Sequence, residues 1–417
     1  MSHQRTSWTA RLACAVTLLP LIAGSAALAE SDNYVEIARG KALATAGDCV
    51  ACHTAKGGAP FAGGLALQTP FGAIMTANLT PDNATGIGSW SADDFARAMH
   101  EGRRPGGTYL YPAFPYPYYT KVTRDDLDAI YAYLRSLPPV TNAVNRNTLP
   151  FPFNMRPMMS GWNALYFTSG TFTPDPSRSE EFNRGAYLVE GLGHCGACHT
   201  PFNSFGANKA DKYLQGNQID YWAAPNITND TQSGLGKWSV EDIVQYLKSG
   251  QTGTTLANGP MKDVIENSTS KMPDADLKAI AVYLKERGAA GSPAPAPLAA
   301  GDARMKTGEA IFVDTCSACH TREGAGIEHI FPKLAGNVIT TQNDPASLIR
   351  IVIAGGRAAA TEARPTAPAM PSLGYRLNDD QIAAVVTYVR NSWGNAASPV
   401  SAEAVKTLRN KVTGAAD

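Results

Sequence analysis

The chain has 417 residues, of which 44% are hydrophobic and 17% are charged. At roughly 100–200 residues per domain, this length allows about two to four domains. Lysine plus arginine and aspartate plus glutamate each number 36, so the composition implies no strongly basic surface and excludes a nucleic-acid-binding protein.

Residues 1–29 have the pattern of a secretory signal peptide. Arg5 and Arg11 form its positive start, the apolar run 12–28 follows, and Ala-Leu-Ala at 27–29 is a small-x-small cleavage site. A retained signal anchor is the alternative, but the cleavage site favours removal. No later stretch has the ~20 consecutive apolar residues that a membrane span needs. We therefore expect an exported, periplasmic chain that is soluble or peripheral to a membrane.

The first predicted domain covers residues 30–140 and contains the motif Cys-x-x-Cys-His at 49–53. Apolar residues recur at three and four positions in it, which predicts helices at 39–43, 91–99 and 125–134. Ser91 is a suitable N-cap for the middle helix. We expect the terminal helix to pack across the first one.

Residues 141–179 form an unusually aromatic linker. It carries Phe151, Phe153, Trp162, Tyr166, Phe167 and Phe172. A free linker is not normally so apolar. We expect this aromatic linker to pack the first two domains together or to offer a surface to a partner.

The second predicted domain, residues 180–288, repeats the order of the first. It has the motif Cys-x-x-Cys-His at 195–199, and helices are expected at 184–188, 239–247 and 274–284. Ser239 is the expected N-cap of its middle helix.

A Pro/Ala-rich linker at 289–302 is expected to be a stiff, extended spacer. It leads to a third domain at 303–396, with the motif at 316–320 and helices at 307–311 and 379–389. The remaining residues, 397–417, are expected to be a polar tail without an amphipathic membrane anchor.

All six cysteines after residue 29 belong to the three motifs. The motif residues are Cys49, Cys52 and His53; Cys195, Cys198 and His199; and Cys316, Cys319 and His320. Cys-x-x-Cys-His is the attachment motif of c-type haem, because two thiols on one helical turn reach both porphyrin vinyl groups and the adjacent imidazole reaches the iron. Disulfides, a redox dithiol and zinc sites are the alternatives. Three complete motifs with no cysteine left over favour three covalently bound haem c groups.

The second axial ligand of an electron-transferring haem c is commonly a methionine, whose thioether raises the reduction potential. In the third domain Met370 lies just before the terminal helix, and in the second domain Met261 lies in the corresponding loop. Met272 competes with Met261, but it lies so close to the last helix that a core position is expected. We predict Met261 and Met370 as axial ligands.

The first domain departs from this pattern. Phe114 stands where Met261 stands in the second domain, and phenylalanine cannot ligate iron. The candidate substitutes are Met75, Met99, Met155, Met158, Met159 and His100. Met99 aligns with Leu247 and is interpreted as a core residue. The choice stays open, a five-coordinate haem 1 included, and without methionine this haem is expected to have the lowest potential.

Several short motifs besides Cys-x-x-Cys-His point to one family. They are Thr-Pro-Phe-Gly at 69–72, Asn-Leu-Thr-Pro-Asp at 78–82, Leu-Pro-Phe-Pro-Phe at 149–153, Gly-His-Cys-Gly-Ala-Cys-His-Thr-Pro at 193–201 and Ala-Pro-Asn-Ile-Thr at 224–228. With them, nearly the whole chain after residue 29 resembles the three-haem cytochrome c subunits of bacterial membrane-bound dehydrogenases of the alcohol, aldehyde, gluconate, sorbitol and fructose types. The expected fold is all-α, with three tandem class-I-like cytochrome c domains joined by linkers.

The resemblance implies an electron relay. A dehydrogenase catalytic subunit with a quinone, flavin or molybdenum cofactor would oxidise the substrate. The cytochrome subunit would pass the electrons to ubiquinone while docked on the cytoplasmic membrane. The form Tyr-Pro-Ala-Phe-Pro-Tyr at 111–116 is more similar to cytochromes paired with molybdenum hydroxylases. Two other functions stay open: a free periplasmic multihaem shuttle, and a haem enzyme or sensor that binds a small ligand at an open site on haem 1.

Overall fold

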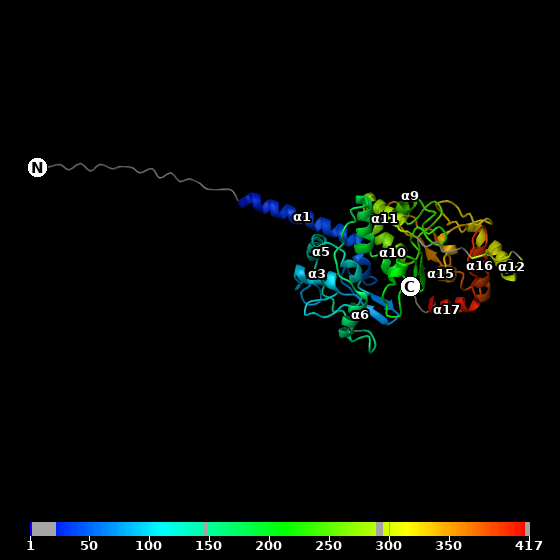
Figure 1. Cartoon of the computed structure of the whole chain (residues 1–417), viewed down its shortest axis with the longest axis horizontal. Helices are drawn as coiled ribbons and strands as arrows, with labels where there is room; N and C mark the ends of the chain where they lie inside the picture. The colour runs from blue at the N-terminus through cyan, green and yellow to red at the C-terminus, as the bar shows by residue number, and fades with distance from the viewer. Residues whose placement is uncertain (2–21, 146–147, 289–294, 300, 413–417) are drawn as a thin grey trace.

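The computed structural model describes the chain except for residues 2–21, 146–147, 289–294, 300 and 413–417. Most of the predicted signal peptide and half of the Pro/Ala linker therefore lie outside the described residues. Figure 1 shows a body from which helix α1 (Ile22–Ala46) projects as a rod. Within the described ranges, no helix is both long enough and apolar enough to cross a membrane.

Three pairs of crossing helices organise the chain into three successive units. In each pair the first and last helices of a unit pack together: α1 with α5 (Arg124–Ser136), α7 (Glu180–Tyr187) with α11 (Asp274–Glu286), and α12 (Ala303–Ile311) with α16 (Asp379–Asn391). The sequence predicted these pairs, because their apolar residues recur at helical spacing.

A glycine in the first helix makes each crossing possible. A Cβ added at Gly40, Gly185 or Gly308 would lie 1.8, 2.0 or 2.3 Å from a carbonyl oxygen of the last helix. These distances are far shorter than van der Waals contact, so the two backbones touch at this position. A larger residue fits only if the helices move apart.

The middle helices begin where their N-caps predict. At the start of α3 (Ala92–Glu101) the Ser91 side chain accepts the Asp94 N–H, and at α9 (Val240–Ser249) Ser239 accepts the Asp242 N–H. In both cases the acidic side chain accepts the N–H of the serine in return, which completes a capping box. Their counterpart in the third unit is α15 (Ala346–Ala354).

The remaining helical segments are mostly short. The α-helices are α2 (Cys49–Cys52), α4 (Tyr116–Tyr119), α6 (Met159–Tyr166), α8 (Gly196–His199), α10 (Pro260–Asn267), α13 (Ser317–His320), α14 (Val338–Thr341) and α17 (Ala402–Val412). The 3₁₀ turns are η1 (Arg156–Met158), η3 (Ala210–Lys212) and η4 (Thr269–Lys271), and the π-helical turns are η2 (Leu188–Leu192) and η5 (Phe312–Cys316).

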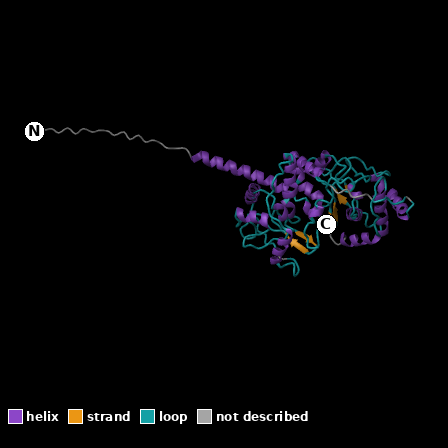
Figure 2. Cartoon of the chain, viewed as in Figure 1, coloured by secondary structure: helices purple, strands orange, loops and turns teal. Residues whose placement is uncertain are grey.

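The expectation of an all-α fold needs a correction, because each unit also contains a small antiparallel ribbon (Figure 2). The pairs are β1 (Ala66–Thr69) with β2 (Gly72–Met75), β3 (Asn217–Ile219) with β4 (Trp222–Ala224), and β5 (Gly356–Arg357) with β6 (Ala369–Met370). Strands of two to four residues are too short to show a period of two in sequence. The chain is thus mainly helical with three two-stranded ribbons.

The C-terminal segment differs from the expected polar tail. Helix α17 packs against α15 and α16, with Val405, Leu408 and Val412 buried. Arg409 also anchors it, because its Nε lies 2.7 Å from Asp379 Oδ1. This helix therefore belongs to the core of the third unit.

The aromatic linker has two parts with different surroundings. Phe172 packs between the cores of the first and second units and lies 5.6 Å from Tyr187, measured between ring centroids. The part from Phe151 to Tyr166, by contrast, exposes several large apolar side chains. One part therefore joins two units and the other forms a surface.

Polar contacts also join the first two units. Tyr187 donates from its hydroxyl to Asp126 Oδ2 at 2.5 Å and accepts the Thr123 N–H at 3.1 Å. Arg39 pairs with the same Asp126 carboxylate at 2.5 Å. Because Asp126 is buried, these donors satisfy a carboxylate that would otherwise be costly to bury.

The second and third units meet through strand β4 and helix α15. The Ala223 N–H donates to Ser347 Oγ at 2.9 Å, and the Ser347 hydroxyl donates to the Ala223 carbonyl at 3.2 Å. The Arg350 guanidinium lies 4.8 Å from the ring centroid of Trp222. The spacer between these units therefore does not leave them as separate bodies.

Candidate functional site

The three Cys-x-x-Cys-His motifs occupy equivalent places. Each lies directly after the first helix of its unit, on the short helices α2, α8 and α13. In every motif the two cysteines are three residues apart and thus lie on one turn. None of these six cysteines is paired in a disulfide among the described residues.

The three histidines share one hydrogen-bond geometry. His53 Nδ1 lies 2.7 Å from the Ala77 carbonyl oxygen, His199 Nδ1 2.7 Å from that of Pro225, and His320 Nδ1 3.0 Å from that of Pro332. A carbonyl oxygen only accepts, so Nδ1 carries the proton and Nε2 keeps a lone pair. Burial lowers the pKa of all three imidazoles, which keeps them neutral. A neutral imidazole with its other nitrogen fixed by a backbone carbonyl is suited to bind a metal.

The thiols have the opposite character to a reactive dithiol. Burial raises the pKa of Cys49 and Cys195 to about 12 and that of Cys316 to about 11. Thiolate is the form that exchanges disulfides, and a reactive dithiol has a lowered pKa. The motifs therefore lack the character of a reactive redox dithiol.

One cavity runs between the second and third units. It is lined by Cys195, His199 and Met261 of the second unit and by Cys316, His320 and Met370 of the third. The space measures about 2520 Å³, including the part open to solvent. The structure thus brings both predicted methionines into the same cavity as the motif histidine of their own unit. Residues of both units therefore line this one cavity.

Met261 is the second residue of helix α10, and Met370 lies in strand β6. The competing Met272 also lines the cavity but is only 5% exposed and packs in the core of the second unit. Since both methionines line the cavity, the choice of Met261 as the ligand stays a prediction.

The hydrogen bonds of the first unit fix the register of Phe114. The Leu110 N–H donates to the Gly102 carbonyl at 2.7 Å, as the Ala257 N–H donates to Gly250 in the second unit at 2.7 Å. Both glycines cap their middle helix. Phe114 lies four residues after the donor Leu110, and Met261 lies four residues after the donor Ala257. The phenylalanine therefore occupies the position of the methionine.

The structure separates the substitutes considered for this ligand. His100 is engaged, because its Nε2 lies 2.7 Å from the Val122 carbonyl oxygen. Met155 and Met158 are 46% and 47% exposed, outside the core of the first unit. Met99 is buried and occupies the position of Leu247, which lines the cavity of the second unit. Met99 packs in the core of the first unit, as its alignment with Leu247 predicted, and the choice among the substitutes stays open.

Asp48 is a functional candidate that the sequence did not single out. It precedes Cys49 in a left-handed conformation and lines the cavity shared by the other two units. Burial, and then the nearby Asp263, raises the pKa of this carboxyl to about 8. Its Oδ1 is buried without a hydrogen-bond partner among the described residues. Since its charge influences Cys49, Cys52 and Cys198, it lies between the first and second motifs.

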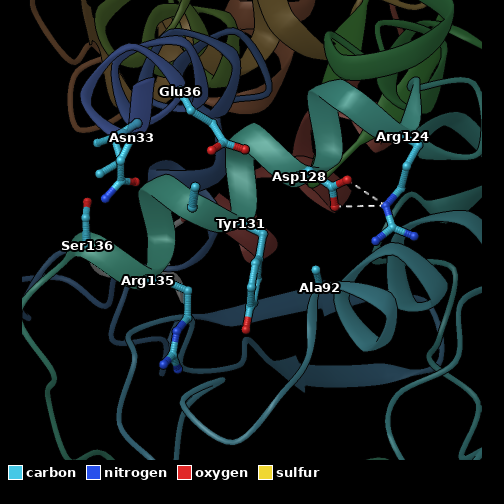
Figure 3. A pocket seen from close by; sticks show the side chains of 10 residues that line it. Asn33, Glu36, Ala92, Arg124, Asp128, Tyr131, Arg135 and Ser136 are labelled. Atoms are coloured by element: carbon cyan, nitrogen blue, oxygen red, sulfur yellow. Dashed lines mark hydrogen bonds and ion pairs between the residues drawn. The ribbon is translucent and has the colours of Figure 1, made fainter. Parts of the chain in front are cut away.

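A second hollow, on the outer side of the first unit, has a different character. It lies between α1, α3 and α5 and is lined by charged side chains such as Glu36 and Arg135 (Figure 3). Arg124, on its rim, is already paired with Asp128 at 2.8 Å. The hollow contains no motif residue, so we assign it no role.

Comparison with known proteins agrees with this site. The cytochrome c family model matches residues 37–138, 182–287 and 305–393, which include all three motifs. The chain belongs to the cytochrome c family, with three cytochrome c domains and three covalently bound haem c groups.

Its relatives narrow the class to cytochrome subunits of dehydrogenases. The chain is 42% identical to the gluconate 2-dehydrogenase cytochrome c subunit of Pantoea cypripedii, over 95% of this chain and 96% of that protein. It is 37% identical to the alcohol dehydrogenase (quinone) cytochrome c subunit of Gluconobacter oxydans, over 98% and 89%. It is also 37% identical to the fructose dehydrogenase cytochrome subunit of Gluconobacter japonicus, over 95% of this chain and 89% of that protein. The resemblance expected from the sequence is confirmed.

Proposed function

We propose that this chain is the electron-transfer subunit of a periplasmic dehydrogenase complex and delivers electrons to ubiquinone at the cytoplasmic membrane. The observation that carries the proposal is the common geometry of His53, His199 and His320, each neutral and fixed through Nδ1. The names of the relatives support a dehydrogenase as the partner. Its catalytic subunit would be a quinoprotein, a flavoprotein or a molybdoprotein.

In this proposal each residue of the motifs has one role. The six motif cysteines form thioethers, the three histidines are axial ligands, and Met261 and Met370 are the opposite ligands in the second and third domains. When bound, haem c supplies a one-electron iron couple. Backbone carbonyls and core packing would hold the ligands in place, and a cavity lined by residues of two units supports two neighbouring haem sites.

The first test is the haem content of the processed chain, made in a host that attaches haem c. Three irons per chain in a pyridine haemochrome assay, and a peroxidase stain that stays with the band on a denaturing gel, are expected. The second test is ubiquinone reduction by the chain together with the dehydrogenase encoded beside it. A chain that purifies alone and does not reduce ubiquinone with that enzyme would instead be a free shuttle.

A second candidate function rests on Phe114, which takes the place of the ligand Met261. An open site on haem 1 would make the chain a haem enzyme or sensor for a small neutral ligand. Carbon monoxide added to the reduced protein separates the two functions. Rapid and complete binding at one haem supports the second candidate, whereas an unchanged spectrum supports a pure relay.

A further inference from the structure

A cluster of exposed apolar side chains follows the first unit along the chain. We call it the 151–166 surface, and its members are Phe151, Phe153, Met155, Met158, Leu165 and Tyr166, with Phe205 beside them. Phe151 is 78% exposed, Leu165 75% and Phe205 65%. Because Tyr166 stacks on Phe205, with 6.2 Å between ring centroids, the surface continues from the first unit onto the second. Its helix, α6, lies at the lower edge of the body in Figure 1.

The first unit holds this surface in place. The buried Tyr116 donates from its hydroxyl to Asn163 Oδ1 at 2.5 Å, and its ring packs edge-on against Trp162. Trp162 in turn donates from Nε1 to the Phe205 carbonyl at 3.0 Å. One side of α6 is thus fixed to the protein, and Met158 and Leu165, two helical turns apart, are exposed on the other.

The chain segments that carry the surface, and two stretches near them in the fold, contain no acidic residue. No aspartate or glutamate lies between Asp128 and Asp175, and none occurs in the adjoining stretches 102–124 and 191–210. Among the basic residues of these stretches, Arg103 and Arg156 lie over Tyr109 and Tyr111, whereas Arg124 is paired with Asp93 and Asp128. Since acids and bases balance over the whole chain, this positive charge is a local feature.

Two of the arginines are held beside the aromatic side chains. Arg103 and Arg156 each place their guanidinium 4.5 Å from a tyrosine ring centroid, that of Tyr109 and that of Tyr111. Tyr111 also donates from its hydroxyl to the Phe153 carbonyl at 2.7 Å. Positive charge and exposed apolar side chains therefore belong to one connected structure.

We propose that the 151–166 surface rests on the anionic face of a lipid bilayer. Aromatic and leucine side chains partition into the headgroup region, and arginines are attracted to anionic lipid phosphates. A large protein partner ordinarily has charges of both signs on its surface, and the surface that binds it then carries complementary charges of both signs. The lack of any acid in all three stretches favours lipid. The inference rests on the proposed function, in which the acceptor is dissolved in the membrane.

The test uses the full chain with its three haems and two kinds of vesicle. Co-sedimentation is measured with vesicles of equal parts phosphatidylglycerol and phosphatidylcholine, and with vesicles of phosphatidylcholine alone. The test variant is Phe151→Ser with Leu165→Ser, which removes two exposed side chains. The matched control is Tyr375→Ser on the third unit, where the side chain is 86% exposed.

The wild-type protein is expected to bind the anionic vesicles, and to bind more weakly as salt rises. The double variant is expected to bind about tenfold less tightly or worse, with the control unchanged. A double variant that binds like the wild type, or a wild-type protein that ignores anionic vesicles, overturns the inference. Loss of dehydrogenase co-purification with unchanged vesicle binding also overturns it, because the surface would then belong to the catalytic subunit.

A separate readout distinguishes this inference from the proposed function. In detergent, the complex containing the double variant should reduce a short-chain ubiquinone as fast as the wild type, because no bilayer is involved. If the wild-type complex itself fails to reduce this quinone, the proposed function is wrong, whatever the vesicles show.

Discussion

The crossing of the first and last helices makes a strong prediction for Gly185→Ala. The added Cβ would lie 2.0 Å from the Ala279 carbonyl oxygen and 2.8 Å from Tyr283 Cβ, whereas real contacts of a Cβ essentially never fall below 3.0 Å. The helices must therefore separate by at least about 1 Å, and the obstacle is backbone, which cannot rotate away. Overpacking a core ordinarily costs about 1–3 kcal/mol. We expect the upper end of that range, about 3 kcal/mol.

The assay is thermal unfolding of the haem-containing protein, followed by circular dichroism. Because the second and third units share one cavity, they should unfold together; for about 150–250 residues 1 kcal/mol corresponds to roughly 2–4 °C, so this unfolding step should fall by about 6–12 °C. Gly161→Ala in α6 is the control, because a Cβ there meets nothing within 4 Å. The control should be neutral or gain up to about 1 kcal/mol from reduced chain entropy. If Gly185→Ala unfolds like the wild type, the close contact between the two backbones does not explain why glycine occupies this position.

Three further outcomes are expected. Met370→Ala should lower the potential of one haem by more than about 59 mV, a tenfold change in its redox equilibrium, in a spectroscopic titration; an unchanged set of potentials would show that Met370 is not a ligand. Tyr187→Phe should cost about 2–3 kcal/mol in urea unfolding, because Asp126 loses a donor and the Thr123 N–H loses its acceptor; a wild-type midpoint would contradict this. Reduction of the haem next to Asp48 adds negative charge beside this carboxyl and so favours its protonation. The reduction potential of that haem should therefore fall by up to about 59 mV per pH unit as the pH rises through about 8. Asp48→Asn should remove this slope, and a slope that persists would assign it to another group.

Those parts of the fold that rest on local chemistry could be predicted from the sequence. The three motifs, the capping serines Ser91 and Ser239, and the terminal helices all depend on spacing within a few residues. The methionines could be chosen because Met261 and Met370 precede the last helix at comparable places. Each of these features is determined by neighbours in the chain.

The parts that were missed depend on contacts between distant residues. The buried side of α17 follows from Val405, Leu408 and Val412, whose spacing was visible, but polar residues around them concealed it. One feature of the sequence pointed to Asp48, because only in the first motif does an acidic residue directly precede the first cysteine. Its burial depends on Asp263 and on a cavity built by other units, neither of which local pattern can show.

The cavity between the second and third units has a consequence for biogenesis. Since one cavity is lined by His199 and Met261 of the second unit and by His320 and Met370 of the third, neither unit can complete its apolar interior before the other arrives. Maturation of the two halves is then a single cooperative event. A chain that fails to load at Cys316 and Cys319 should leave the preceding domain open to proteases as well, so that quality control removes both together.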